Sequence, residues 1–164
     1  MEYTLSDLDL KHFHRAIELA LEAEVEGNLP IGVVISYEGR NVAEGKNSWW
    51  VPEYNPIRHA EIEALMRVPR DLLEHSREIT LYSTLEPCLM CTSAILQHSV
   101  GRVLYGTVDV YGGSGVVFGH MPPYFEEELA KVEWLGPALP EECDPLYKRV
   151  MELVEDRRKS LEKD

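Results

Sequence analysis

The segment EITLYSTLEPCLMCTSAIL, residues 78–96, joins a strand-like run to a helix-like run and anchors the fold prediction for the chain. The EITLYST run predicts a strand, and Leu85-Glu86-Pro87 then leads into a helix that begins at Cys88 and ends near His98. In α/β proteins such a loop lies at the carboxyl edge of the sheet, where ligands usually bind. We therefore expect residues 85–91 to face a binding site.

The segments around this unit alternate between helical spacing and strand-like runs. The spacing predicts helices over about residues 7–26, 58–67, 124–131 and 144–161, and strands over 31–37, 42–45, 102–106 and 132–135. A turn over residues 38–41 joins the first two strands into a hairpin. This order predicts an α/β sandwich with one mixed sheet and helices on both faces.

Composition limits the class of protein. The 164 residues fit one domain, which we place at residues 1–164. No apolar run approaches a membrane span, and the acidic N-terminus does not resemble a secretory signal, so we expect a cytoplasmic protein with no membrane partner. The formal net charge of −13 repels polyanions and weakens the case for nucleic acid.

Two short motifs together predict a metal site. Cys88 and Cys91 are spaced i and i+3, so a helix places both thiols on one face. His59 adds an imidazole, and a site with three such ligands keeps the open fourth position of a catalytic zinc. Glu61 is not needed as a ligand, and His59 and Glu61 can address one site only if the N-terminus of their helix faces it.

The ligand set predicts hydrolytic chemistry. Zinc lowers the pKa of a bound water toward ~7, which produces hydroxide near neutral pH. A carboxylate beside the metal, such as Glu61, is suited to carry protons from the water to a leaving group. The alternatives are a redox pair and a structural zinc site. A structural site needs a fourth protein ligand, which His75, His98, His120 or Cys143 could supply.

These motifs resemble the H-x-E and P-C-x-x-C signature of the zinc-dependent nucleobase and nucleoside deaminases, the cytidine deaminase-like superfamily. Further segments resemble its cytosine, guanine and tRNA-adenosine deaminase branch: residues 28–32, 44–47, 84–88 and 101–106. The resemblance implies one zinc per chain on His59, Cys88 and Cys91, with Glu61 as the proton shuttle. It also implies base contacts from Asn47 and the Ala60 backbone, a three-layer α/β/α sandwich with a five-stranded sheet, and a homodimer.

Loop residues near the motifs are candidates for contact with the substrate ring. Trp49 and Trp50 precede the histidine motif and can stack on a flat ring, although loop anchoring is the usual fate of such residues. Asn47 and Asp109 can line the site or hydrogen-bond their own turns. Phe118 is a candidate for the wall of the binding site.

The motifs predict a reaction, the hydrolytic loss of ammonia from an electron-poor ring carbon. They do not specify the substrate. The net charge of −13 favours a small free nucleobase or nucleoside of the guanine, cytosine or adenine type. The alternative is a tRNA adenosine deaminase, because LEPCLMC and residues 101–115 resemble the bacterial members most closely. A third hypothesis is a zinc-binding dimerisation module without turnover, against which the intact Glu61 argues.

Overall fold

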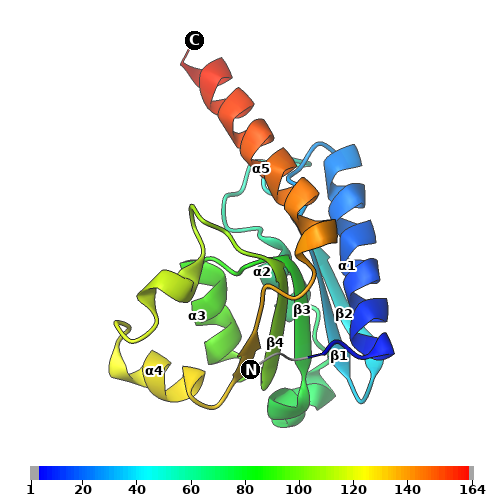
Figure 1. Cartoon of the computed structure of the whole chain (residues 1–164), viewed down its shortest axis with the longest axis vertical. Helices are drawn as coiled ribbons and strands as arrows, with labels where there is room; N and C mark the ends of the chain where they lie inside the picture. The colour runs from blue at the N-terminus through cyan, green and yellow to red at the C-terminus, as the bar shows by residue number, and fades with distance from the viewer. Residues whose placement is uncertain (1–3, 163–164) are drawn as a thin grey trace.

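A computed structural model of the chain describes residues 4–162, so the termini of the domain predicted at 1–164 lie outside it. One five-stranded mixed sheet, in the order β2-β1-β3-β4-β5, carries helices on both faces (Figure 1), which confirms the predicted fold class. The strands are β1 (Gly32–Tyr37), β2 (Arg40–Lys46), β3 (Thr80–Leu85), β4 (Arg102–Thr107) and β5 (Glu133–Leu135). The α-helices are α1 (Asp7–Val25), α2 (Ala60–Leu65), α3 (Leu89–Gln97), α4 (Pro123–Leu129) and α5 (Pro140–Leu161).

The β1–β2 hairpin is tighter than predicted. Tyr37 pairs with Arg40, so Glu38 and Gly39 alone form the turn, with φ angles of 48° and 73°. Two residues with positive φ give the turn whose twist matches that of the flanking strands. The predicted four-residue turn is wrong because strand pairing extends to Arg40.

The parallel half of the sheet brings the site loops together. β3 pairs in parallel with β4, and β4 pairs in parallel with β5, whereas β1 is antiparallel to β3. The loops that leave the carboxyl ends of β3 and β4 therefore share one edge of the sheet. An isolated bridge between Cys88 and Gly113 joins these loops directly.

The side chains of β1 alternate between two cores. Val34 packs with Ala16 and Leu19 of α1, while Val33 belongs to the larger cluster that includes Ala60 of α2. Close approach of α2 requires a glycine in β2, since a Cβ added at Gly45 would lie 2.1 Å from the Ala60 carbonyl oxygen. This contact fixes the start of α2, and with it the histidine motif, against the sheet.

The last helix begins earlier than predicted and runs past the sheet. α5 starts at Pro140 rather than near Asp144, because Pro140 takes the first helical position and Pro145 is accommodated inside the helix. Its C-terminal half projects away from the sheet (Figure 1). Among the described residues, no helix is both long and apolar enough to cross a membrane. Two 3-10 helices, η1 (Arg70–Glu78) and η2 (Ser114–Val117), were not predicted.

Candidate active site

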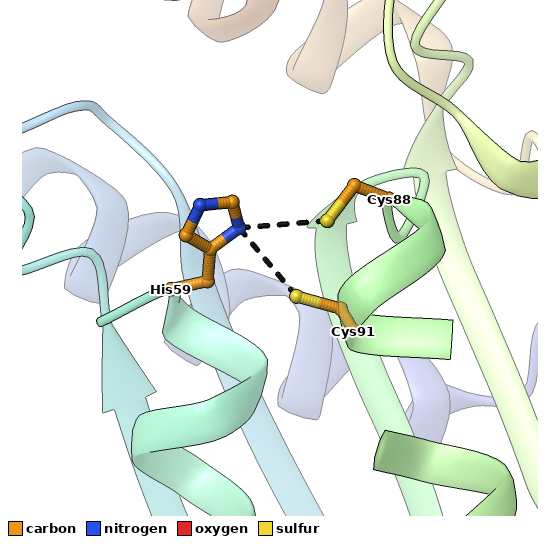
Figure 2. A group of neighbouring side chains, drawn as sticks. All are labelled: His59, Cys88 and Cys91. Carbon is orange, nitrogen blue, oxygen red and sulfur yellow. Dashed lines mark hydrogen bonds between the residues drawn. The ribbon is translucent and has the colours of Figure 1, made fainter. Parts of the chain in front are cut away.

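Three potential metal ligands from two segments lie together at the carboxyl edge of the sheet. His59 Nδ1 is 3.6 Å from Cys88 Sγ and 3.5 Å from Cys91 Sγ, and all three side chains point toward one another (Figure 2). Two donors on a tetrahedral zinc lie about 3.6 Å apart at ordinary Zn–N and Zn–S lengths. The spacing of these three side chains therefore fits a zinc ion.

The site keeps one position open. Within residues 4–162, His59, Cys88 and Cys91 form the one group of at least three potential ligand residues whose ligand atoms lie within 4.8 Å of one another. The alternative fourth ligands, His75, His98, His120 and Cys143, do not join it. Three protein ligands and an open position are the arrangement of a catalytic rather than a structural zinc.

Two helix N-termini meet at this site, as the sequence analysis required. His59 is the N-cap of α2 and Cys88 is the N-cap of α3, so Cys91 lies in the first turn of α3. The free N–H groups and the positive dipole ends of both helices favour negative charge at this point. Because Glu61 is in the first turn of α2, it faces the same site as His59 despite their i, i+2 spacing.

Cys88 and Cys91 shift each other's pKa in opposite directions. A hydrogen bond from Cys91 lowers the pKa of the Cys88 thiol to about 4, with a further contribution from His59. The pKa of Cys91 is raised because its thiol is hydrogen-bonded to Cys88 and buried. The hydrogen bond with Cys88 also raises the pKa of His59. The lowered pKa favours the thiolate form of Cys88, which is the form that ligates a metal.

Glu61 is a buried carboxyl group beside the three ligand residues. Its side chain is only 4% exposed, and Oε2 accepts a hydrogen bond from Cys91 Sγ at 3.3 Å. Burial, followed by the charge of Cys88, raises the pKa of Glu61 to about 7. A carboxyl group with that pKa can both accept and release a proton near neutral pH.

A cavity of about 260 Å³ opens onto these residues. Its walls include the following apolar side chains: Leu29, Ile31, Trp49, Leu85, Val150, Met151 and Val154. The ring of Trp49 also lies 5.7 Å from that of His59, centroid to centroid. Since drug-sized ligands occupy sites of roughly 300–1,000 Å³, this volume suits a single small heterocycle.

The description "Cytidine and deoxycytidylate deaminase zinc-binding region" belongs to the family model that matches residues 6–107, more than half of the chain. This chain belongs to that deaminase family. A tRNA-specific adenosine deaminase of Haemophilus influenzae is 39% identical over 111 residues, which are 66% of this chain and 64% of that protein. The match thus spans less than two thirds of the relative's length.

Two further comparisons cover a larger share of this chain. A tRNA-specific adenosine deaminase of Bacillus subtilis is 30% identical over 159 residues, 95% of this chain and 96% of that protein. A solved structure from a study of A-to-I editing by tRNA:A34 deaminases has a TM-score of 0.59 at 34% identity. That similarity covers 70% of this chain and 92% of the solved one.

Asn47 is fully buried, and its amide donor has no partner in the part of the chain that the structure describes. Its Oδ1 accepts hydrogen bonds from the backbone N–H groups of Leu29 at 3.4 Å and Trp49 at 3.1 Å. Its Nδ2 has no hydrogen-bond partner among the described residues, although a buried amide normally has one. The turn role predicted for Asn47 therefore uses Oδ1, and Nδ2 is left for the predicted contact with the substrate.

The aromatic residues predicted to contact the substrate do not all lie at the cavity. Trp49 lines the cavity, but Trp50 lies outside it and faces an adjacent groove with Arg157. The prediction of Phe118 as a wall of the site is corrected, since its ring packs edge-on against Trp134 at 5.5 Å and does not line the cavity. The loop carries Phe118 away because it turns through η2 after leaving the site.

Asp109 lines the cavity, yet its carboxylate mainly holds its own loop. Oδ1 accepts hydrogen bonds at 2.9 Å from the N–H groups of Tyr111 and Gly112. Glu86, buried beside the cavity, accepts from the N–H groups of Asp109 at 3.1 Å and Gly115 at 2.9 Å. This second carboxylate joins the two site loops, and the sequence did not predict it.

The sequence also did not predict that α5 forms one wall of the cavity. Four side chains of this helix line the cavity: Tyr147, Val150, Met151 and Val154. Their spacing of i, i+3, i+4 and i+7 indicates that one face of the last helix is buried. Nothing in that spacing identifies the surface that the face covers.

Proposed function

We propose that this deaminase converts adenosine to inosine in the anticodon loop of a tRNA. The observation that carries the proposal is the similarity to the Bacillus subtilis tRNA-specific adenosine deaminase over 95% of this chain. A match of that length includes the part of α5 that walls the cavity. The comparisons support this reading better than the free base that the sequence analysis favoured.

In this proposal His59, Cys88 and Cys91 hold one zinc ion per chain. Their mutual distances fit the ion, and the N-termini of α2 and α3 stabilise the two thiolates. When bound, zinc supplies a polarised water at the open position. Cys91 would lose its thiol proton on ligating the ion, because a metal ligand of this type is a thiolate.

Glu61 is the proton carrier. A C–O bond forms at the ring carbon that carries the amino group, and the C–N bond then breaks to release ammonia. Glu61 takes a proton from the water and delivers it to the departing nitrogen, a transfer that its position beside the ligands allows. Its burial excludes bulk water from this exchange.

Three groups orient the base. Nδ2 of Asn47, which has no partner among residues 4–162, donates to a ring acceptor, and the backbone N–H of Ala60 in the first turn of α2 provides a second donor. Trp49 packs against the flat ring beside His59. These contacts place the ring carbon near the open position.

A free nucleobase or nucleoside is the second candidate substrate. The observation that favours it is the net charge of −13, which opposes the approach of any polyanion. The cavity of about 260 Å³ is also large enough for one heterocycle, so a free base needs no contacts outside it. Both candidates use the same zinc and proton chemistry.

The two candidates are separated by turnover of the zinc-loaded chain. One arm follows inosine formation in an anticodon stem-loop with adenosine at the target position, and the other follows ammonia release from free bases and nucleosides. Inosine in the stem-loop, with no ammonia released from any free base or nucleoside, supports the proposal. Ammonia released from a free base or nucleoside, with no inosine in the stem-loop, supports the second candidate. The Glu61→Ala variant is the negative control in both assays. No product in either arm would favour a zinc-binding module without turnover.

We also propose a homodimer. Three apolar side chains in and after the loop that follows β4, Val110, Tyr111 and Val116, are 84–85% exposed in the single chain. Exposed apolar side chains this close in the sequence are candidates for a contact between two copies of the chain. Sedimentation equilibrium tests the assembly, and a monomer at micromolar concentration would contradict it.

A further inference from the structure

Glu86 is a buried carboxylate that takes no part in the proposed metal ligation or proton transfer. It lies two residues before Cys88, lines the cavity and is only 7% exposed. The partners of its side chain are backbone N–H groups, and among residues 4–162 no basic side chain forms an ion pair with it. Because a carboxylate is costly to bury unless hydrogen bonds replace its hydration, these N–H groups are what keep Glu86 inside.

The two oxygens of Glu86 hold the two ends of one loop, residues 109–115, which we call the clamped loop. Oε2 accepts a hydrogen bond from the N–H of Asp109 at 3.1 Å, and Oε1 accepts one from the N–H of Gly115 at 2.9 Å. The backbone N–H of Glu86 donates to the carbonyl of Thr107 at 2.8 Å, just before the clamped loop begins. The fit is close, since a Cβ added at Gly115 would lie 2.8 Å from Oε1.

The clamped loop in turn contacts the segment that carries a proposed metal ligand. Gly113 forms an isolated β-bridge with Cys88, and the N–H of Ser114 donates to the carbonyl of Pro87 at 3.1 Å. The buried hydroxyls of Ser114 and Thr92 are 2.7 Å apart, which joins the clamped loop to α3. Cys88 is the N-cap of α3, so its backbone position decides where its sulfur lies. Movement of the clamped loop would therefore reach the metal site.

We propose that Glu86 is a positioning residue for the deamination. It holds the clamped loop, and the clamped loop holds Cys88 in the geometry that zinc requires. Groups that orient a metal ligand from outside the coordination sphere typically contribute roughly 10–100-fold to metal affinity or activity. Glu86 also shapes the cavity wall, because Asp109 and Gly112 of the clamped loop line the cavity. The inference rests on the proposed zinc site and applies to either candidate substrate.

The decisive measurement is the zinc affinity of the wild type, Glu86→Gln and Glu86→Ala. Each zinc-loaded chain is titrated with a competing chelator, and the zinc retained gives the Kd. Glu86→Ala removes both acceptors, whereas Glu86→Gln keeps one oxygen and turns an NH2 group toward the other N–H. We expect the Kd for zinc to rise roughly 10–100-fold in Glu86→Ala and by less in Glu86→Gln. At saturating zinc, KM should also rise in both variants because the cavity wall is loosened.

Gly115→Ala tests the same contact from its other side. The added methyl group would displace Oε1 of Glu86, so this variant should also weaken zinc binding. In a chain that already carries Glu86→Ala there is no carboxylate to displace, and Gly115→Ala should then change the Kd little. Additive losses in the double variant would show that the two residues act separately and would overturn the inference. If Glu86→Ala does not fold, Glu86→Gln and Gly115→Ala each still test the clamp.

Asp9→Asn separates positioning from a general loss of stability. Asp9 is buried and hydrogen-bonded to Tyr82 and Arg102, and none of the three lines the cavity. Asp9→Asn should lower the unfolding temperature and leave the Kd for zinc unchanged. Equal zinc affinity of the wild type and both Glu86 variants, or an equal loss in Asp9→Asn, would overturn the inference and leave the proposed function standing. A wild type that binds no zinc would remove the proposed function and the inference together.

Discussion

The hydroxyl of Tyr147 on α5 donates a hydrogen bond to Asp109 Oδ1 in the loop after β4, at 2.9 Å. The same carboxylate holds the turn at Tyr111 and Gly112, and Glu86 holds the other end of the loop. The C-terminal helix is thereby joined to the site loops across the cavity. The shape of the cavity depends on this connection as well as on the apolar side chains of α5.

Removal of this hydrogen bond should loosen the cavity without disturbing the metal. Tyr147→Phe keeps the ring but removes the donor, and a typical hydrogen bond contributes about 0.5–1.5 kcal/mol. We expect kcat/KM to fall roughly three- to tenfold, mainly through KM, with unchanged zinc content. Tyr124→Phe is a matched control, since the Tyr124 hydroxyl bonds Gln97 on the surface, 3.3 Å away. Equal activity of both variants would show that the Tyr147–Asp109 bond does not shape the site.

Glu61 is expected to be essential for turnover and dispensable for the metal. General acid–base catalysis contributes about 10²–10⁴-fold, and the three ligand residues do not include Glu61. Glu61→Ala and Glu61→Gln should therefore lose at least two orders of magnitude in kcat while each retains about one zinc per chain. Metal analysis and a product assay on the same preparations test this. Loss of zinc in the Glu61→Gln variant would assign the carboxylate to the coordination sphere instead.

Cys88 should couple metal content to stability. Its substitution leaves two protein ligands, and the free energy of metal binding adds to the stability of the folded state. We expect Cys88→Ala to lose most of its zinc and to unfold at a lower temperature than the zinc-loaded wild type. Cys143→Ala is the control, because Cys143 is buried against Gly106 and outside the ligand group. That variant should keep its zinc, and a Cys88→Ala protein with full zinc would contradict the ligand assignment.

The sequence predicts the element order and the ligand group because both depend on local spacing. The i, i+3 cysteines and the helix start at His59 read directly from the chain. The wall that α5 supplies could not be predicted, since an apolar stripe specifies that a face is buried and not what it covers. The preference for a small substrate rested on net charge, which sums over the whole surface, whereas binding responds to the local charges around the site.

Asp9 should make the fold acid-sensitive in a defined pH window. This carboxylate caps α1 and accepts hydrogen bonds from Tyr82 at 2.9 Å and Arg102 at 2.7 Å. Burial alone would raise the pKa of Asp9, but the hydrogen bonds from Arg102, Ser6 and Tyr82 outweigh it and lower the pKa from 3.8 to about 2. A group whose pKa is lower in the folded state stabilises that state above its unfolded pKa, and the contribution declines as the pH falls toward the folded pKa.

The shift corresponds to about 2 kcal/mol at neutral pH, of which about half should be lost by pH 3. Urea unfolding of the wild type and Asp9→Asn at pH 7, 5 and 3 measures this contribution as the difference in free energy of unfolding. The difference should be constant between pH 7 and 5 and should narrow at pH 3. Asp7→Asn is the matched control, because it changes an exposed acid in the same first turn, and its free energy of unfolding should differ little from that of the wild type at pH 7. A difference for Asp9→Asn that did not narrow at pH 3 would show that its pKa is not lowered by folding.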